Sequence, residues 1–314
     1  MSAVRIEELR KVFGTFQALD GLSLTVEGGT VFGFLGPNGA GKTTTIRILT
    51  GLAHATSGHA WVLGKEVTAN GRETARHIGY LPEEPAFYPW MTPREFLDFV
   101  GRVFGLPAAE RSSRTNELLA LAGLEEAAKR RIGGFSRGMR QRLALAQALL
   151  NHPEVLFMDE PASALDPEGR KEVLDFIGSL RGQCTVFMST HILADVERVC
   201  DTVGIINQGK LVIADSQESL LANYAIPAFE VGVDAQSESG LIPWSDALRQ
   251  EGWVKSVLLQ GLVARVVVSD VEMAKRELLA SIIYAGLTLT RYEIVRPSLE
   301  DVFLQLVNQE EGQR

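Results

Sequence analysis

The chain has 314 residues and a mass of 34.3 kDa, enough for roughly two domains of ordinary size. Its formal net charge of −8 lacks the basic excess typical of proteins that coat nucleic acid, so we expect no nucleic-acid partner. The two cysteines, Cys184 and Cys200, lie in apolar stretches, which is typical of a reducing compartment. We expect both to be small core residues.

No segment of the sequence resembles a membrane span. The first residues contain Arg5 and Glu7 and no apolar run, so no secretory signal is predicted. The longest stretch without Asp, Glu, Lys or Arg, residues 48–64, is interrupted by histidines and glycines. Any contact with a membrane is therefore expected to go through a partner protein.

Residues 4–188 predict a sheet whose strands alternate with helices. Residues 4–9 and 22–26 alternate apolar and polar positions as half-buried strands do, with Gly14 and Gly21 between them. Short apolar runs at residues 31–35, 155–158 and 185–188 are typical of strands that are covered on both faces. They alternate with helical spacing, which indicates a parallel α/β sheet, and residues 93–151 predict an inserted helical subdomain.

The chain is predicted to change domain near residues 225–227. We expect a first domain over residues 1–224 and a second over residues 228–309. In the second, strands at 229–233, 254–259, 262–269 and 287–295 and helices at 244–250 and 271–285 give the ferredoxin-like order βαββαβ. Ser298 and Asp301 resemble a capping box that opens a last helix, through about residue 307.

A phosphate-binding loop is the strongest motif in the sequence. One segment matches G-x-x-x-x-G-K-[ST] in full, after a predicted strand and before a predicted helix: Gly36, Pro37, Asn38, Gly39, Ala40, Gly41, Lys42 and Thr43, with Thr44 following. Its backbone N–H groups and the helix N-terminus favour phosphate oxygens. Lys42 would reach the β- and γ-phosphates of ATP, and the Thr43 hydroxyl would ligate Mg²⁺.

Catalytic groups are expected at the carboxyl ends of the neighbouring strands. Asp159 and Glu160 end one apolar run, so Asp159 can hold Mg²⁺ and Glu160 can take a proton from the attacking water. His191 follows another strand, where it could contact the γ-phosphate or Glu160. An acidic pair after a strand can also be a solvated loop, but its combination with the phosphate loop favours catalysis.

A second motif connects the chain to a known family. The segment Phe135, Ser136, Arg137, Gly138, Met139, Arg140, Gln141 and Arg142 resembles the signature motif of ATP-binding cassette (ABC) ATPases, and the resemblance covers about residues 4–220. It implies a P-loop ATPase core with antiparallel β and helical subdomains. It also implies that Ser136, Arg137, Gly138 and Met139 contact ATP held by the loop of a second subunit, with Ser136 capping a helix.

Further family positions follow in the expected order. The resemblance assigns Phe13 to adenine stacking, with Phe16 as an alternative, Asp166 to the D-loop and His191 to the switch histidine. Glu83 stands where the family has a glutamine that contacts ATP and Mg²⁺. An ionised glutamate only accepts hydrogen bonds and adds charge near the metal. Arg137 replaces a signature glycine, and we expect this to be tolerated because Ser136 and Gly138 remain.

The resemblance also predicts what the protein does. The ending Pro297 to Phe303 and the signature look like the ATPase subunits of ABC-2-type exporters, which serve drug, sodium or polymer export. This implies Mg-ATP hydrolysis by a head-to-tail dimer on the inner, cytoplasmic face of a membrane, bound to a separate permease. The aromatic segment 87–91 suits a permease contact, or simply a packed loop. The carboxyl-terminal domain is expected to aid dimerisation or regulation.

Two other functions compete with this interpretation. A soluble ABC ATPase could act on ribosomes or DNA, but such proteins commonly carry two cassettes or long insertions, which are not seen in this sequence. A small-molecule kinase would leave the signature motif, the D-loop and His191 without a role.

Overall fold

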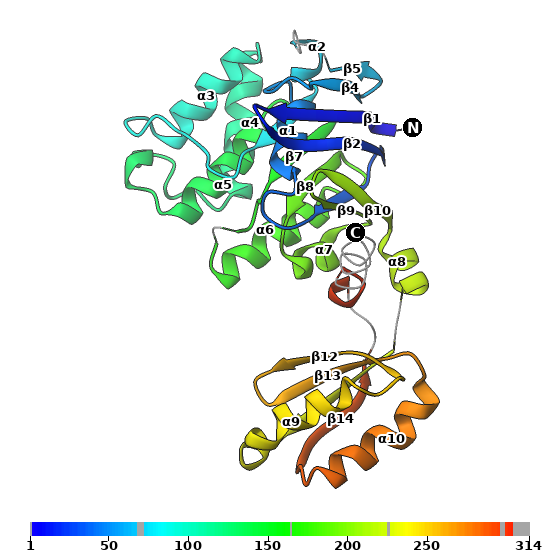
Figure 1. Cartoon of the computed structure of the whole chain (residues 1–314). Coiled ribbons are helices and arrows are strands. Elements are labelled where there is room, and N and C mark those ends of the chain that lie inside the picture. The colour runs from blue at the N-terminus through cyan, green and yellow to red at the C-terminus, as the bar shows by residue number, and fades with distance from the viewer. Residues whose placement is uncertain (1, 68–71, 164, 225–226, 296–298, 304–314) are drawn as a thin grey trace. The chain divides into compact units, whose positions relative to one another are not determined.

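The computed structural model describes residues 2–67, 72–163, 165–224, 227–295 and 299–303. It forms two compact units, Met1–Gln217 and Glu218–Arg314, and each is described by itself (Figure 1). Helix α8 (Gln217–Tyr224) follows the first unit. The predicted domain boundary at residues 225–227 lies further along the chain and stays a prediction; residues 225 and 226 lie outside the described part.

A six-stranded sheet forms the centre of the first unit, in the order β10-β9-β3-β8-β7-β6. Its strands are β3 (Val31–Leu35), β6 (Ile78–Leu81), β7 (Val155–Asp159), β8 (Thr185–Thr190), β9 (Thr202–Asn207) and β10 (Lys210–Ser216). All neighbours are parallel except β10, which runs antiparallel to β9. Every residue of β3, β7 and β8 is buried, which explains their apolar runs. The predicted parallel α/β sheet is confirmed.

A second, antiparallel sheet has the order β2-β1-β4-β5. It contains β1 (Ser2–Phe13), β2 (Phe16–Glu27), β4 (Ser57–Val62) and β5 (Lys65–Glu66). The first two strands extend well beyond the predicted segments 4–9 and 22–26. Gly21, with φ +73°, lies between the pairs Leu9–Leu22 and Arg10–Asp20 and forms a bulge, so β2 continues through it.

The two sheets share one hydrophobic core. Helix α1 (Lys42–Leu49) contributes Ile46 and Leu49 to a cluster that also contains Phe34 and Phe187 of the parallel sheet and residues of β1 and β2. On the opposite face of β3, Gly33 lies so close to Cys200 that a Cβ there would come within 2.7 Å of the sulfur. Cys184 and Cys200 are both buried and free, as predicted.

The inserted segment of the first unit is helical, as predicted for residues 93–151. It contains α3 (Pro93–Val103), α4 (Ala108–Leu121), the 3₁₀ turn η1 (Ile132–Gly134) and α5 (Arg137–Ala148), and the short α2 (Arg72–Ala75) precedes it. Helix α6 (Pro167–Ser179) follows β7, and helix α7 (Leu193–Val199) follows β8. Thr92 and Glu95 form a full capping box that starts α3.

The carboxyl-terminal unit is a four-stranded antiparallel sheet with two long helices. Its elements are β11 (Ala228–Val233), η2 (Ala235–Ser237), α9 (Glu238–Leu248), β12 (Val254–Gln260), β13 (Val263–Val268), α10 (Val271–Tyr284) and β14 (Leu289–Val295). The sheet order β12-β13-β11-β14 and the shared core of both helices confirm the ferredoxin-like order. Helix α9 starts at Glu238, before the predicted residue 244, and holds Pro243 in its interior. Residues 299–303 are helical, and Ser298 lies outside the described residues.

Within the part of the chain that the structure describes, no helix combines the length and the apolar character that a membrane crossing requires.

Candidate nucleotide site

The phosphate-binding loop connects β3 to α1, as the sequence predicts. Gly36 approaches strand β9 so closely that a Cβ would lie 2.3 Å from the carbonyl oxygen of Ile206. Gly41 directly precedes α1 with φ +109°, in a conformation that glycine adopts without strain. The two glycines therefore let the loop turn tightly and bring the N-terminus of α1 to the end of the sheet.

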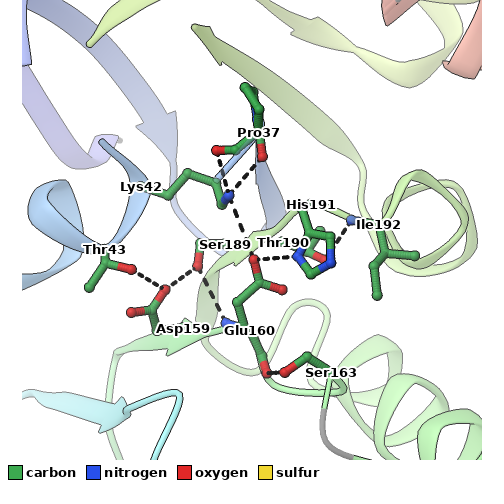
Figure 2. A network of polar contacts seen from close by, with 11 residues as sticks. Pro37, Lys42, Thr43, Asp159, Glu160, Ser163, Ser189, Thr190, His191 and Ile192 are labelled. Carbon is green, nitrogen blue, oxygen red and sulfur yellow. Dashed lines mark hydrogen bonds and ion pairs between the residues drawn. The ribbon is translucent and has the colours of Figure 1, made fainter. Parts of the chain in front are cut away.

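Lys42 is held inside this loop. Its Nζ donates to the carbonyl oxygens of Gly36 (2.7 Å) and Pro37 (3.2 Å) and lies 3.6 Å from Oε1 of Glu160 (Figure 2). The Lys42 side chain is only 6% exposed. Burial lowers the pKa of Lys42, and the nearby carboxylates of Glu160 and Asp159 oppose this shift. The ammonium group thus lies between the loop and the acidic pair.

A cluster of oxygen atoms surrounds the carboxylate of Asp159. The hydroxyls of Thr43 (3.1 Å) and Ser189 (2.5 Å) both donate to Oδ1 of Asp159 (Figure 2). These side chains come from α1, β8 and the end of β7. Hydroxyl and carboxylate oxygens are the ligands that Mg²⁺ prefers, so this set of donors fits the metal that an ATPase needs.

Glu160 follows directly and adopts an unusual backbone conformation, with φ +49°. Its N–H donates to the carbonyl oxygen of Ser189 (3.1 Å), and its own carbonyl accepts from the Ser163 hydroxyl (3.1 Å). Non-glycine residues in this region are strained and are often found at functional sites. Here the surrounding bonds hold the strained turn in place.

The carboxylate of Glu160 is buried and only half satisfied. Oε1 lies 2.9 Å from Nδ1 of His191 and also faces Lys42 (Figure 2). Oε2 is buried and has no hydrogen-bond partner among the described residues. A buried polar atom of this kind calls for an explanation, and an acceptor poised for a water molecule supplies one.

Lys42, Thr43, Glu160 and His191 border one open cleft of about 360 Å³, whereas Asp159 lies behind Thr43 and is not among its lining residues, and neither are the predicted loop residues Gly36, Pro37 and Ala40. Predicted site residues that line it are Asn38, Gly39, Gly41, Lys42, Thr43, Thr44, Glu83, Glu160 and His191. Phe16 lines the cleft, whereas Phe13, its partner across the β1–β2 hairpin, does not. The structure therefore favours Phe16, the alternative in the sequence analysis, as the aromatic residue beside a bound base.

The signature residues do not line the cleft of their own chain. The Ser136 hydroxyl caps α5 by accepting from the N–H of Met139 (3.2 Å), and Gly138 lies against Leu165. Arg137 and Asp166, the residue before α6, are likewise absent from the lining. A nucleotide bound in the cleft would therefore not be contacted by these residues of the same chain.

Ala18, which lines the cleft, and two polar side chains near it were not predicted as site residues. Ser189 donates the shortest hydrogen bond that Asp159 receives, and Gln141, buried in α5, donates to the carbonyl oxygen of Pro161 (3.0 Å). The position of Ser189 at the end of a buried strand, two residues before His191, was a usable signal. The contact of Gln141 depends on how α5 packs, and no local pattern reveals it.

Comparisons with known proteins place the chain in a family. Residues 19–163 match the family described as "ABC transporter", and residues 220–307 match the "ATP-binding protein DrrA1-3-like, C-terminal domain". An uncharacterized ABC transporter ATP-binding protein of Bacillus subtilis, YxlF, is 42% identical over 303 residues, covering 96% of this chain and 99% of that protein. The chain therefore belongs to the ABC transporter ATP-binding proteins.

Two further similarities extend this result. The Nod factor export ATP-binding protein I of Burkholderia lata is 35% identical, over 99% of this chain and 98% of its own length. A solved structure of an ATP-binding subunit of an ABC transporter matches 71% of this chain and 93% of its own, with a TM-score of 0.65 and 29% identity. The predictions of an ABC fold and of an ATP-hydrolysing, exporter-type transporter subunit are confirmed, and the soluble alternative is not favoured.

Proposed function

We propose that the chain hydrolyses Mg-ATP in the cleft beside the phosphate loop, with Glu160 as the group that activates the attacking water. The carboxylate of Glu160 carries this proposal: it is buried, held by His191 at Oε1, and free to accept a proton at Oε2. A positioned general base of this kind contributes roughly 10²- to 10⁴-fold to a rate.

The other residues of the site would position the nucleotide and neutralise the charge of its phosphates. Lys42 would leave its loop carbonyls to contact the β- and γ-phosphates, and the N-terminus of α1 favours the same negative charge. Thr43 and Asp159 would hold Mg²⁺, with Glu83 in the same cleft, and the metal would offset the charge of the phosphate oxygens. Phe16, which is 60% exposed, would stack on the adenine.

The signature residues are placed to contact ATP that is bound by a second copy of the chain. Ser136 and Gly138 start α5 outside the cleft of their own subunit, where their N–H groups can face a phosphate of another. A head-to-tail dimer would place them over ATP bound by the partner. ATP shared by two subunits favours the closed dimer, and hydrolysis would let it open.

The exporter's membrane component is proposed to be a separate permease on whose cytoplasmic face this chain binds. Tyr88 and Trp90 are 43% and 63% exposed, although their rings lie only 5.2 Å apart, while Phe87 packs on Phe96. The segment is thus partly a packed loop and partly an exposed aromatic surface. Exposed aromatic side chains beside the helical subdomain suit a permease contact.

The substitution Glu160→Gln tests the site. It keeps the size of the side chain but removes the basic carboxylate, so we expect ATPase activity to fall at least about 100-fold while ATP still binds. With Mg-ATP, light scattering should then show a stable dimer.

Lys42→Ala is the matched control, because it should lose nucleotide binding and stay monomeric. A Glu160→Gln protein that hydrolyses ATP at the normal rate would contradict the role of Glu160. One that binds ATP but remains monomeric would contradict the shared site only.

A further inference from the structure

The carboxyl-terminal unit contains a second open cavity, between helices α9 and α10. Its volume is about 660 Å³, and all its lining residues belong to this unit. Sites for small organic molecules usually measure about 300 to 1,000 Å³. None of these residues takes part in the proposed ATP chemistry, so the groove calls for a role of its own.

The floor of the groove is aromatic and fixed. Trp244 and Trp253 line it and are only 5% and 9% exposed. The indole N–H of Trp244 donates to the Ser281 hydroxyl (3.0 Å), and that hydroxyl donates to the carbonyl oxygen of Leu278 (2.8 Å). This chain of bonds holds the ring in one orientation, so the groove presents a preformed apolar surface.

The groove is open because small residues of both helices line it. Gly240 and Ala247 contribute from α9, and Ala280 contributes from α10. Tyr284 also lines the groove, yet the residue is 97% exposed. A flat aromatic ring left in solvent at the edge of an apolar groove can cover a bound molecule.

The charge of the groove has one sign. Glu251 and Glu277 are its charged lining residues, and no lysine or arginine lines it. Neither carboxylate forms an ion pair within the described residues, although many other surface carboxylates of the chain do. Carboxylates beside indole and phenol rings favour a positive charge, since the ring faces attract cations as well.

We propose that this groove binds a lipophilic organic cation, with its apolar body on Trp244 and Trp253 and its charge near Glu251 and Glu277. The site is independent of the ATP cleft. Binding therefore does not require nucleotide, and failure of the proposed ATPase mechanism would leave it untouched.

Equilibrium dialysis of the full chain without nucleotide tests the proposal. The probes are tetraphenylphosphonium and the neutral triphenylphosphine oxide. We expect one saturable phosphonium site per chain, weakened about tenfold by Glu251→Gln with Glu277→Gln and abolished by Ala280→Trp, which fills the groove. The phosphine oxide should bind more weakly and respond only to Ala280→Trp.

Glu272→Gln is the matched control, because Glu272 lies on the same helix but pairs with Lys275 (2.7 Å) and does not line the groove. It should leave binding unchanged. If Ala280→Trp fails to fold by circular dichroism, Ala247→Phe fills the same space from α9.

Three results would overturn the proposal. The first is no saturable phosphonium binding, and the second is binding that survives a filled groove. The third is equal binding before and after both glutamates are neutralised. Capture of a cationic amphipathic peptide with no affinity for the phosphonium would instead assign the groove to a protein helix.

Discussion

Single residues at the ends of β7 and β8 decide the chemistry of the ATP site. Asp159 and Glu160 are adjacent in sequence, but their environments differ. Asp159 accepts two hydroxyl hydrogen bonds through one oxygen, which suits a metal ligand held in one orientation. Glu160 has a buried oxygen without a partner among the described residues, which suits a proton acceptor.

Ser189 should matter through Asp159. Ser189→Ala removes the hydroxyl that donates to Oδ1, so the carboxylate loses one of the two bonds that orient it. Loss of such a supporting bond typically weakens metal binding about 10- to 100-fold. We expect the Mg²⁺ concentration for half-maximal ATPase activity to rise by about that factor, with much of the rate recovered at high Mg²⁺.

A magnesium titration of ATPase activity measures this effect. Ser163→Ala is the control: Ser163 bonds the backbone of Glu160 rather than the metal ligand, so its magnesium requirement should stay normal. An unchanged requirement in Ser189→Ala would show that Thr43 alone orients Asp159.

The residues of the site were predictable to different degrees. Lys42, Thr43 and Asp159 follow from a motif and a strand end, which are local features. Choosing between Phe13 and Phe16 needs the folded hairpin, in which the two residues are paired and only Phe16 lines the cleft. The positive φ of Glu160 likewise arises from bonds to β8 and is invisible in the sequence.

At the scale of elements, two helix starts use the same chemistry for different purposes. Thr92 caps α3 through a reciprocal bond with Glu95, and Ser136 caps α5 through a bond to Met139. Substitution of either cap by alanine should lower stability by about 1 kcal/mol. Only Ser136 lies in the signature motif, so only its loss should impair ATP hydrolysis.

The pair Ser136→Ala and Thr92→Ala separates stability from function. Urea midpoints should fall by similar amounts in both proteins. The ATPase rate should fall severalfold or more in Ser136→Ala and stay near normal in Thr92→Ala. Equal losses of activity would mean that helix capping, and not contact with ATP, explains the role of Ser136.

The elements with a strong sequence pattern were the predictable ones. The buried strands β3, β7 and β8 appear as apolar runs because both of their faces are covered. Strands β4, β5, β6 and β10 were not predicted. β4 mixes buried, half-buried and exposed residues, β10 is mostly half-buried, and β5 and β6 have only two and four residues, so each carries too little pattern to identify.

At the scale of the whole molecule, each of the two units has its own hydrophobic core. The order of motifs predicted the family, since it depends on sequence alone. The role of the second unit could not be predicted in the same way. The proposed binding groove lies between two helices, and strand β14 lies at the edge of the sheet; only the folded chain creates these surfaces.

Removal of the carboxyl-terminal unit tests whether it supports dimerisation. A chain ending at residue 224 retains the core of the first unit and all the proposed ATP-binding residues. Strand β14 lies at the edge of its sheet and exposes 53% of Ile294, a surface suited to contact another chain. In a Glu160→Gln background we expect the truncated dimer to dissociate with a Kd about tenfold higher, equivalent to about 1.4 kcal/mol. Analytical ultracentrifugation in Mg-ATP measures this constant. An unchanged Kd there would remove the second unit from dimerisation, and an unchanged ATPase rate in a truncated chain that keeps Glu160 would remove it from regulation of hydrolysis.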